Sequence, residues 1–237
     1  MLNRLYSRAR RWVDERSFPP IVRAVSRDAL TYLNHAALND LHQRVQAIER
    51  HRQEGILIEA GCALGGSAIV IAAAKSTQRR LYVYDVFGMI PPPSENDDAD
   101  VQERYAVIRS GQSTGLKGHA YYGYEDNLLG KVIDNFRRHG VAIEDNNVHL
   151  VRGLFQDTLS VNEPVALAHV DGDWFESVLT CLQRIEPHLT DNGVMVIDDY
   201  DAWSGCRKAV DAYFSDKHSR YDFVRKTRLH IVRKPPR

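Results

Sequence analysis

The sequence predicts an α/β fold with a mostly parallel sheet, N-terminal helices and a C-terminal antiparallel hairpin. Three observations predict it: strand-like and helical segments alternate from Gly55 onward, the last two strand-like runs are separated by only two residues, and the first fifty residues have helical periodicity. Strands that alternate with helices form right-handed β–α–β units and parallel sheets. Two strands joined by so short a turn pair antiparallel.

Residues 1–52 are expected to form a helical extension. Pro19-Pro20 breaks an arginine-rich helical stretch, and a second helix is expected over about Ser26–Arg52. The arginines could indicate contact with nucleic acid or a membrane. Asp14 and Glu15 dilute their charge, however, and a mixed charged face is typical of a solvated or packing helix.

Residues 53–237 are expected to form one domain of alternating elements. The expected strands are Gly55–Gly61, Arg80–Phe87, Val148–Phe155, Val165–Val170, Gly193–Ile197, Tyr221–Lys226 and Leu229–Lys234. Helices are expected over Ser67–Lys75, which is rich in alanine, and over Trp174–Leu189. Each strand is a short apolar run, as expected for strands buried in a sheet core.

The segment Gly88–Tyr124 does not follow this alternation. It contains three consecutive prolines, an acidic run and only a short helical patch around Val101–Ile108. Connections of this length in compact domains are usually functional lids or disordered segments. We therefore interpret residues 88–124 as a lid-like insertion, with a mobile surface loop as the alternative. Tyr121, Tyr122 and Tyr124 at its end could line a pocket.

Composition excludes several classes of function. The 31 Lys and Arg balance the 31 Asp and Glu, so the chain lacks the overall positive charge of nucleic-acid-binding proteins. The longest apolar run, Ala68–Ala74, is too short to span a bilayer, and the N-terminus lacks the apolar core of a secretory signal. Three cysteines match no zinc pattern. A cytoplasmic protein with no nucleic-acid or membrane partner is expected.

A glycine-containing turn joins the first expected strand to its helix. Gly61, Gly65 and Gly66 allow close approach of a ligand to the backbone and to the free N–H groups of a helix N-terminus. Asp85, at the end of the second strand, is placed to accept hydrogen bonds from ribose hydroxyls. Glycine is common in any tight turn, but together with Glu59 and Asp85 it indicates a nucleoside cofactor. The spacing differs from the dinucleotide pattern and favours S-adenosylmethionine over NAD.

Carboxylates follow the fourth and fifth expected strands. Asp171 and Asp173 end one strand, and Asp198 and Asp199 end the next. Neighbouring parallel strands present their carboxyl ends at the same sheet edge, so Asp171, Asp198 and Asp199 should converge. Clustered carboxylates repel one another unless a cation is bound, and Mg²⁺ prefers such oxygen ligands. Asp171, Asp198 and Asp199 are the expected metal ligands, which leaves Asp173 as a general base.

Other interpretations of these residues remain open. Acidic residues commonly cap helices, and Asp173 precedes a helix start. His169 is interpreted as a hydrogen-bonded core histidine rather than a ligand. Trp174 and Trp203, which flank the acids, are equally consistent with core packing and with substrate stacking.

These residues lie in motifs that resemble the macrocin O-methyltransferase family (TylF/MycF/NovP type), over roughly residues 50–235. The motifs are ILIEAGCALGGSA, VYDVF, RGLFQDTL, AHVDGDWFESV and VIDDYDAW. The resemblance implies a Rossmann-like class I methyltransferase fold and Mg²⁺-dependent methylation of a sugar hydroxyl on a glycosylated natural product or polysaccharide. It also implies a homodimer formed through the N-terminal helices.

The resemblance assigns roles to the same positions. It implies Asp171, Asp198 and Asp199 as metal ligands and Asp173 as general base. The expected contacts to S-adenosylmethionine are Glu59, Gly61, Ala63, Gly65, Ser67, Asp85 and Asp157. The N-terminal fifty residues and the insertion do not match clearly, and the acceptor is therefore the least defined part of the prediction.

Three alternatives compete with a methyltransferase. Asp171-Gly172-Asp173 is also a D-x-D motif that could hold a metal-bound nucleotide sugar in a glycosyltransferase, but 237 residues is short for one. A phosphohydrolase with an aspartyl nucleophile carries this motif after its first strand, whereas here it follows the fourth. A non-catalytic nucleotide-binding module leaves the clustered aspartates without a role.

Overall fold

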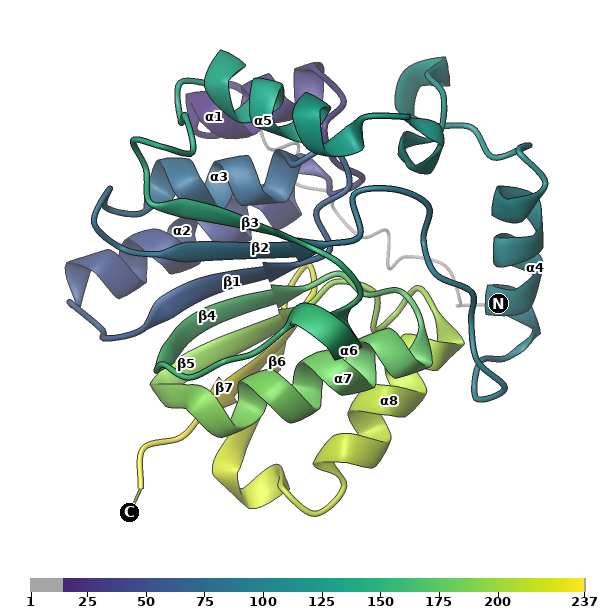
Figure 1. Cartoon of the computed structure of the whole chain (residues 1–237). Helices are drawn as coiled ribbons and strands as arrows, with labels where there is room; N and C mark the ends of the chain where they lie inside the picture. Colours follow the sequence, from purple (N-terminus) through teal and green to yellow (C-terminus); the bar gives the residue numbers. More distant parts are fainter. Residues whose placement is uncertain (1–14, 237) are drawn as a thin grey trace, which may run out of the picture.

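The computed structural model describes residues 15–236 and contains a seven-stranded sheet between two layers of helices (Figure 1). The strands are β1 (Ile56–Ala60), β2 (Leu81–Asp85), β3 (Val148–Arg152), β4 (Val165–Val170), β5 (Leu189–Ile197), β6 (Tyr221–Arg225) and β7 (Leu229–Arg233). Their order in the sheet is β3-β2-β1-β4-β5-β7-β6. Strands β1 to β5 pair in parallel, and β7 pairs antiparallel with β5 and β6. The predicted fold class is confirmed.

One face of the sheet is covered by α1 (Pro20–Arg27), α2 (His35–Arg50), α3 (Gly66–Ala74) and α5 (Leu128–Arg138) (Figure 1). These helices and the strands share a continuous apolar core that includes Leu38, Ile69, Phe136 and Leu57, all buried. Helices α1 and α2, which form the described part of the predicted N-terminal extension, therefore pack in the same core as the sheet. Residues 1–14, where the arginine-rich helix is expected to begin, lie outside the described residues.

The opposite face is covered by α6 (Phe155–Thr158), α7 (Phe175–Ile185) and α8 (Ser204–Phe214). A second apolar core lies there, and its largest side chains include Phe214 and Tyr221. Every residue of β1 and β4 is buried, because both strands are central and have helices on both faces. The continuous apolar runs seen in the sequence follow from this two-sided burial.

Several element boundaries differ from those expected. The helix expected over about Ser26–Arg52 is observed as α2, but it begins only at His35. Residues 20–27 form the separate helix α1, which starts at Pro20, where proline is favoured at the first helical position. Asn34 then caps α2 by accepting a hydrogen bond from the Ala37 N–H at 3.0 Å. Strand β5 begins at Leu189 rather than Gly193, and β3 ends at Arg152. Helices α5 and α8 were not predicted at all.

The insertion carries α4 (Ala99–Arg109) and two short 3₁₀ helices, η2 (Leu116–Gly118) and η3 (Tyr122–Tyr124). Outside the insertion, the described residues also form the 3₁₀ helices η1 (Glu15–Ser17), η4 (Glu186–His188) and η5 (His218–Arg220). Figure 1 shows α4 to one side of the sheet, beyond its carboxyl edge. The buried Asp97 carboxylate accepts hydrogen bonds from the Phe175 N–H at 2.8 Å and the Ser94 N–H at 2.9 Å. The Trp174 indole donates to the Pro91 carbonyl at 3.0 Å. These bonds hold the insertion against the start of α7.

Within residues 15–236, no helix is both long enough and apolar enough to cross a membrane. The cysteines Cys62, Cys181 and Cys206 are all buried and free.

Candidate active site

The carboxyl edge of the sheet brings the predicted site residues together. Sheet-type hydrogen bonds continue one residue past three strands: Gly61 N–H donates to the Tyr84 carbonyl, Asp171 N–H to Ala60 and Asp198 N–H to Val170, at 2.8, 2.8 and 3.0 Å. The backbone of these residues is therefore fixed by the sheet itself. The convergence expected from neighbouring parallel strands is observed for the backbone.

Gly61 lies where β1 and the segment after β4 approach most closely. A Cβ at this position would be 1.9 Å from the Asp171 carbonyl oxygen, and Gly61 has φ +89°, a conformation that disfavours other residues. This glycine is therefore required by the close backbone approach, whatever ligand the turn binds.

We expect Gly61→Ala to lower the free energy of unfolding by about 2–5 kcal/mol, because both overpacking and the left-handed φ are unfavourable. Urea denaturation measures it. Gly140→Ala is the matched control: Gly140 has φ +74° but open space around its Cβ. It should lose only about 1–2 kcal/mol. Equal losses in both variants would contradict the steric explanation.

The Asp85 side chain forms hydrogen bonds to the two loops that follow β1 and β2 and border the site. Its carboxylate accepts hydrogen bonds from the Cys62 N–H at 2.7 Å and the Phe87 N–H at 2.6 Å, and the residue is buried. Burial raises the pKa of Asp85, and these two N–H donors oppose the rise. The Asp85 side chain also lines both cavities described below.

Glu59, Ser67 and His169 form a fully buried polar group beneath the turn. The Ser67 hydroxyl donates to Glu59, and His169 Nδ1 lies 3.0 Å from the other Glu59 oxygen. Burial opposes the charge on His169, but Glu59 and Asp198 outweigh it and raise its pKa to about 10. The prediction of a hydrogen-bonded core histidine agrees with this placement. Glu59 and Ser67 face one another rather than the cavities.

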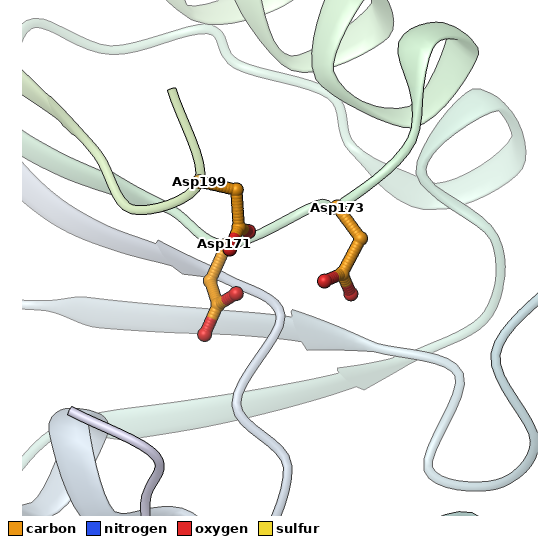
Figure 2. A group of neighbouring side chains, drawn as sticks. All are labelled: Asp171, Asp173 and Asp199. Atoms are coloured by element: carbon orange, nitrogen blue, oxygen red, sulfur yellow. The ribbon is translucent and has the colours of Figure 1, made fainter. Parts of the chain in front are cut away.

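Asp171, Asp173 and Asp199 form a compact carboxylate cluster (Figure 2). One oxygen of each side chain lies within 4.8 Å of the others. Burial, with repulsion from the neighbouring aspartates, raises the pKa of Asp171 and Asp173 well above the usual carboxyl range. Burial and the charge of Asp198 raise the pKa of Asp199 to about 7. Asp199 Oδ2 is buried and has no hydrogen-bond partner among the described residues. The cluster therefore has the donor set and the unsatisfied charge that a hard divalent cation would neutralise.

Asp198 faces a different group. Its Oδ1 accepts a hydrogen bond from Arg228 Nε at 2.7 Å and lies 3.4 Å from His169 Nε2. Burial opposes ionisation of Asp198, but the hydrogen bond and charge of His169, with Arg228, outweigh it and lower its pKa. Consecutive residues leaving a strand project to opposite sides, which separates Asp198 from Asp199. The structure thus places Asp173, rather than Asp198, with Asp171 and Asp199.

Asp173 itself has φ +54°, in the left-handed region that residues with side chains seldom adopt. Strained backbone of this kind clusters at functional sites. Asp173 lies just before α7, whose N-cap residue Trp174 makes no side-chain capping bond, and the Phe175 N–H donates to Asp97 rather than to Asp173. The helix-capping interpretation of Asp173 therefore has no support in this geometry.

Two adjoining cavities meet at the cluster. The first is lined by Gly61 and Asp85 together with Leu154, Phe155 and Gln156 from the start of α6. The second has a volume of about 290 Å³. Its lining includes Tyr32, Arg104, Tyr121, Trp203 and Arg228. Gly61, Asp85, Tyr122, Asp171 and Asp173 border both cavities. A cofactor in one and an acceptor in the other would meet beside Asp171 and Asp173.

Some predicted residues lie elsewhere. Ala63 lines the second cavity, but Gly65 caps α3 with φ +90° against Val132 and lines neither cavity. Asp157 is exposed on α6 and also lines neither. Trp174 is buried and also lines the second cavity together with Trp203, which is consistent with both roles considered for these residues.

Sequence reasoning missed three residues of the second cavity. Tyr32 lies in the loop before α2, Arg104 on α4 and Arg228 in the turn between β6 and β7. Of these three residues, only Arg228 could have been placed in the site from the sequence. It lies in the short hairpin turn before β7, and β7 pairs with β5, so this turn lies at the same sheet edge as Asp198.

Comparison with known proteins identifies O-methyltransferases whose sequences are similar to that of this chain. The model of the macrocin O-methyltransferase (TylF) family matches residues 6–225, which includes N-terminal residues that the motif resemblance did not cover. A tetracenomycin-C rhamnosyl 4'-O-methyltransferase from Streptomyces olivaceus is 31% identical over 191 residues, covering 78% of this chain and 67% of that protein. The demethyldecarbamoylnovobiocin O-methyltransferase of Streptomyces niveus is 27% identical over 192 residues, covering 78% of this chain and 68% of that protein.

Among solved structures, the O-methyltransferase NovP has the same fold. The two structures superpose with a TM-score of 0.71 at 24% identity, over 88% of this chain and 83% of NovP. Since the family match spans most of the chain, the chain belongs to the macrocin O-methyltransferase family and is an O-methyltransferase.

Proposed function

We propose that the chain transfers the methyl group of S-adenosylmethionine to a sugar hydroxyl of a glycosylated natural product or polysaccharide, with Mg²⁺ as a cofactor. The observation that carries this proposal is the meeting of two cavities at a carboxylate cluster, one bordered by the glycine turn and Asp85. The named activity of the tetracenomycin relative, a 4'-O-methyltransferase of a rhamnosyl compound, supports the acceptor class, and the novobiocin relative is also named as an O-methyltransferase.

The first cavity suits S-adenosylmethionine. Its methionine portion would pass the turn at Gly61, and the ribose hydroxyls would donate to Asp85. Phe155 and Leu154 offer apolar surface for the adenine, and Gln156 offers hydrogen bonds. Glu59 and Ser67, which were expected to contact the cofactor directly, would instead support the turn from beneath. Gly65 and Asp157 remain predictions as contacts.

The cluster fits Mg²⁺, because three carboxylates converge and Asp199 Oδ2 lacks any other partner among the described residues. Asp171 and Asp199 would hold the cation. Asp198 remains the third ligand expected from the sequence, and it could bind only by exchanging its contact with Arg228. When bound, the cation would lower the pKa of an acceptor hydroxyl and fix its position.

Asp173 would act as the general base. It borders both cavities, so its carboxylate can take the proton from an acceptor hydroxyl as the oxygen attacks the methyl carbon. The C–O bond forms while the S–CH₃ bond breaks in line, and the sulfonium electrons return to sulfur to give S-adenosylhomocysteine. The remaining residues contribute positioning, because the attacking oxygen and the methyl group must be held close and aligned.

Calorimetric titration with S-adenosylhomocysteine, with and without Mg²⁺, tests the proposal. We expect the product to bind in both conditions, since the first cavity does not depend on the cluster being neutralised. Release of S-adenosylhomocysteine from S-adenosylmethionine should occur with a glycoside acceptor and stop in EDTA. A chain that fails to bind S-adenosylhomocysteine would overturn the cofactor assignment, and full activity in EDTA would overturn the metal assignment.

The homodimer also remains a proposal. It rests on the resemblance of the motifs, and the packing of α1 and α2 on their own sheet leaves open which of their surfaces a second copy would cover.

A further inference from the structure

The two arginines of the second cavity, Arg104 and Arg228, have different surroundings. Arg228 pairs with Asp198, and its Nε donates to that carboxylate at 2.7 Å. Arg104 is half-buried on α4, and within residues 15–236 no carboxylate lies within ion-pair distance of it. Arg104 is therefore a cation in the cavity that forms no ion pair with a carboxylate in the described chain.

Contacts around α4 hold Arg104 in place. Its guanidinium carbon lies 5.8 Å from the centre of the Tyr121 ring, a cation–π contact. At the start of α4, Asp98 pairs with Lys208, and Asp100 accepts hydrogen bonds from the backbone and hydroxyl of Ser204. These nearby acids are already engaged with α8 and leave Arg104 free to face the cavity.

A guanidinium that lines a cavity and has no ion-pair partner among residues 15–236 is suited to a planar anionic group of a ligand. Arg presents five N–H donors in a fixed fork, which matches the paired oxygens of a carboxylate or phosphate, and it carries its charge at every physiological pH. A neutral sugar hydroxyl needs no such cation. The charge of Arg104 opposes the rise in the pKa of Asp173, so the two side chains interact across the cavity, but no ion pair joins Arg104 to any acid of the carboxylate cluster.

We propose that Arg104 is a specificity-determining residue that binds an anionic group on the acceptor, so that the preferred acceptor is an anionic sugar. This inference rests on the proposed methyltransferase function and narrows its substrate class. The anionic oxygens can belong to the carboxylate of a uronic acid or to the diphosphate of a nucleotide-linked sugar. Bound to Arg104, that group anchors the acceptor in the cavity that Asp171 and Asp173 also line.

The test compares three acceptors that share one hexose: its methyl glycoside, the corresponding uronic acid glycoside, and the nucleoside-diphosphate sugar. Binding of each is measured by calorimetry with S-adenosylhomocysteine and Mg²⁺ present, and KM is measured with S-adenosylmethionine. We expect one of the two anionic acceptors to bind at least tenfold more tightly than the methyl glycoside. Which of them it is identifies the source of the anion.

The variants Arg104→Met and Arg104→Lys separate recognition from structure. Arg104→Met should weaken the preferred anionic acceptor about 10–100-fold, since hydrogen bonds to charged groups contribute this much. It should leave the methyl glycoside and S-adenosylhomocysteine affinities unchanged, and Arg104→Lys should recover part of the loss. Arg109→Met, an exposed arginine at the end of the same helix, is the control and should change nothing.

The outcomes separate this inference from the function on which it rests. A methyl glycoside that binds as tightly as both anionic acceptors would overturn the role of Arg104 and leave the methyltransferase function standing. Equal weakening of all three acceptors by Arg104→Met would also overturn it. Loss of S-adenosylhomocysteine binding by the unmodified chain would instead overturn the proposed function.

Discussion

Asp173→Asn should reduce the turnover number by about 10²–10⁴-fold, the usual contribution of a general base. The affinity for S-adenosylhomocysteine should stay unchanged, and the melting temperature should not fall. Asparagine preserves the shape of the side chain and tolerates the left-handed φ of +54° at this position. It also removes one of the charges whose repulsion raises the pKa of Asp171. Steady-state kinetics, calorimetry and thermal unfolding measure these three quantities.

The same variant decides between the two roles that the geometry allows Asp173. A base can be lost without loss of the cation, so Mg²⁺ affinity should persist in Asp173→Asn and fall sharply in Asp171→Asn. If both variants lose Mg²⁺ equally, Asp173 is a ligand, as its place in the cluster permits, and the base must be sought elsewhere. Asp216→Asn makes the same charge change at an exposed position outside the site and should behave like the unmodified chain.

Mg²⁺ should raise the melting temperature much more at about pH 8 than at about pH 5. At a concentration 100-fold above its Kd, a cation that binds only the folded chain adds about 2.7 kcal/mol, or roughly 5–10 °C for a domain of this size. The effect requires ionised ligands and therefore grows as the carboxyls lose their protons. Thermal unfolding across this pH range, in Mg²⁺ and in EDTA, measures it.

The direction of this pH dependence follows from the carboxyl pKa values of the folded chain without the cation. Burial and repulsion raise the pKa of Asp199 to about 7, above its value in the unfolded chain. The folded state then binds protons more tightly than the unfolded state, so this group costs stability as the pH rises from the unfolded pKa through the folded one. The chain in EDTA should therefore lose stability between about pH 4 and pH 7 from this group, and Mg²⁺ should restore it.

Asp171→Asn is the companion variant for this experiment. With one ligand removed, its melting temperature should respond little to Mg²⁺. It should also vary less with pH, because Asp171, whose own pKa is raised by burial, no longer titrates. A response to Mg²⁺ as large as that of the unmodified chain would mean that the cation binds at another place. A difference between Mg²⁺ and EDTA that does not change with pH would show that the cluster is ionised without the cation.

The sequence by itself determined the order of strands and helices and the position of the acids in that order. Continuous apolar runs such as Val165–Val170 show burial on both faces, and this is a local property of the chain. Because parallel strands end at one edge, the sequence also placed Asp85, Asp171 and Asp199 on the same side of the sheet. Helices α5 and α8 were not predicted from the sequence, although each buries one apolar face, as α7 does.

Only the tertiary structure decided which carboxylates converge. Asp198 and Asp199 are adjacent in sequence, yet Asp198 pairs with Arg228 and His169 while Asp199 joins Asp171 and Asp173. The second cavity likewise combines Tyr32, Arg104 and Arg228 from segments far apart in the chain. The physical reason is that periodicity and composition report local burial, whereas the partners of a buried charge depend on side-chain directions and on distant segments that packing brings together.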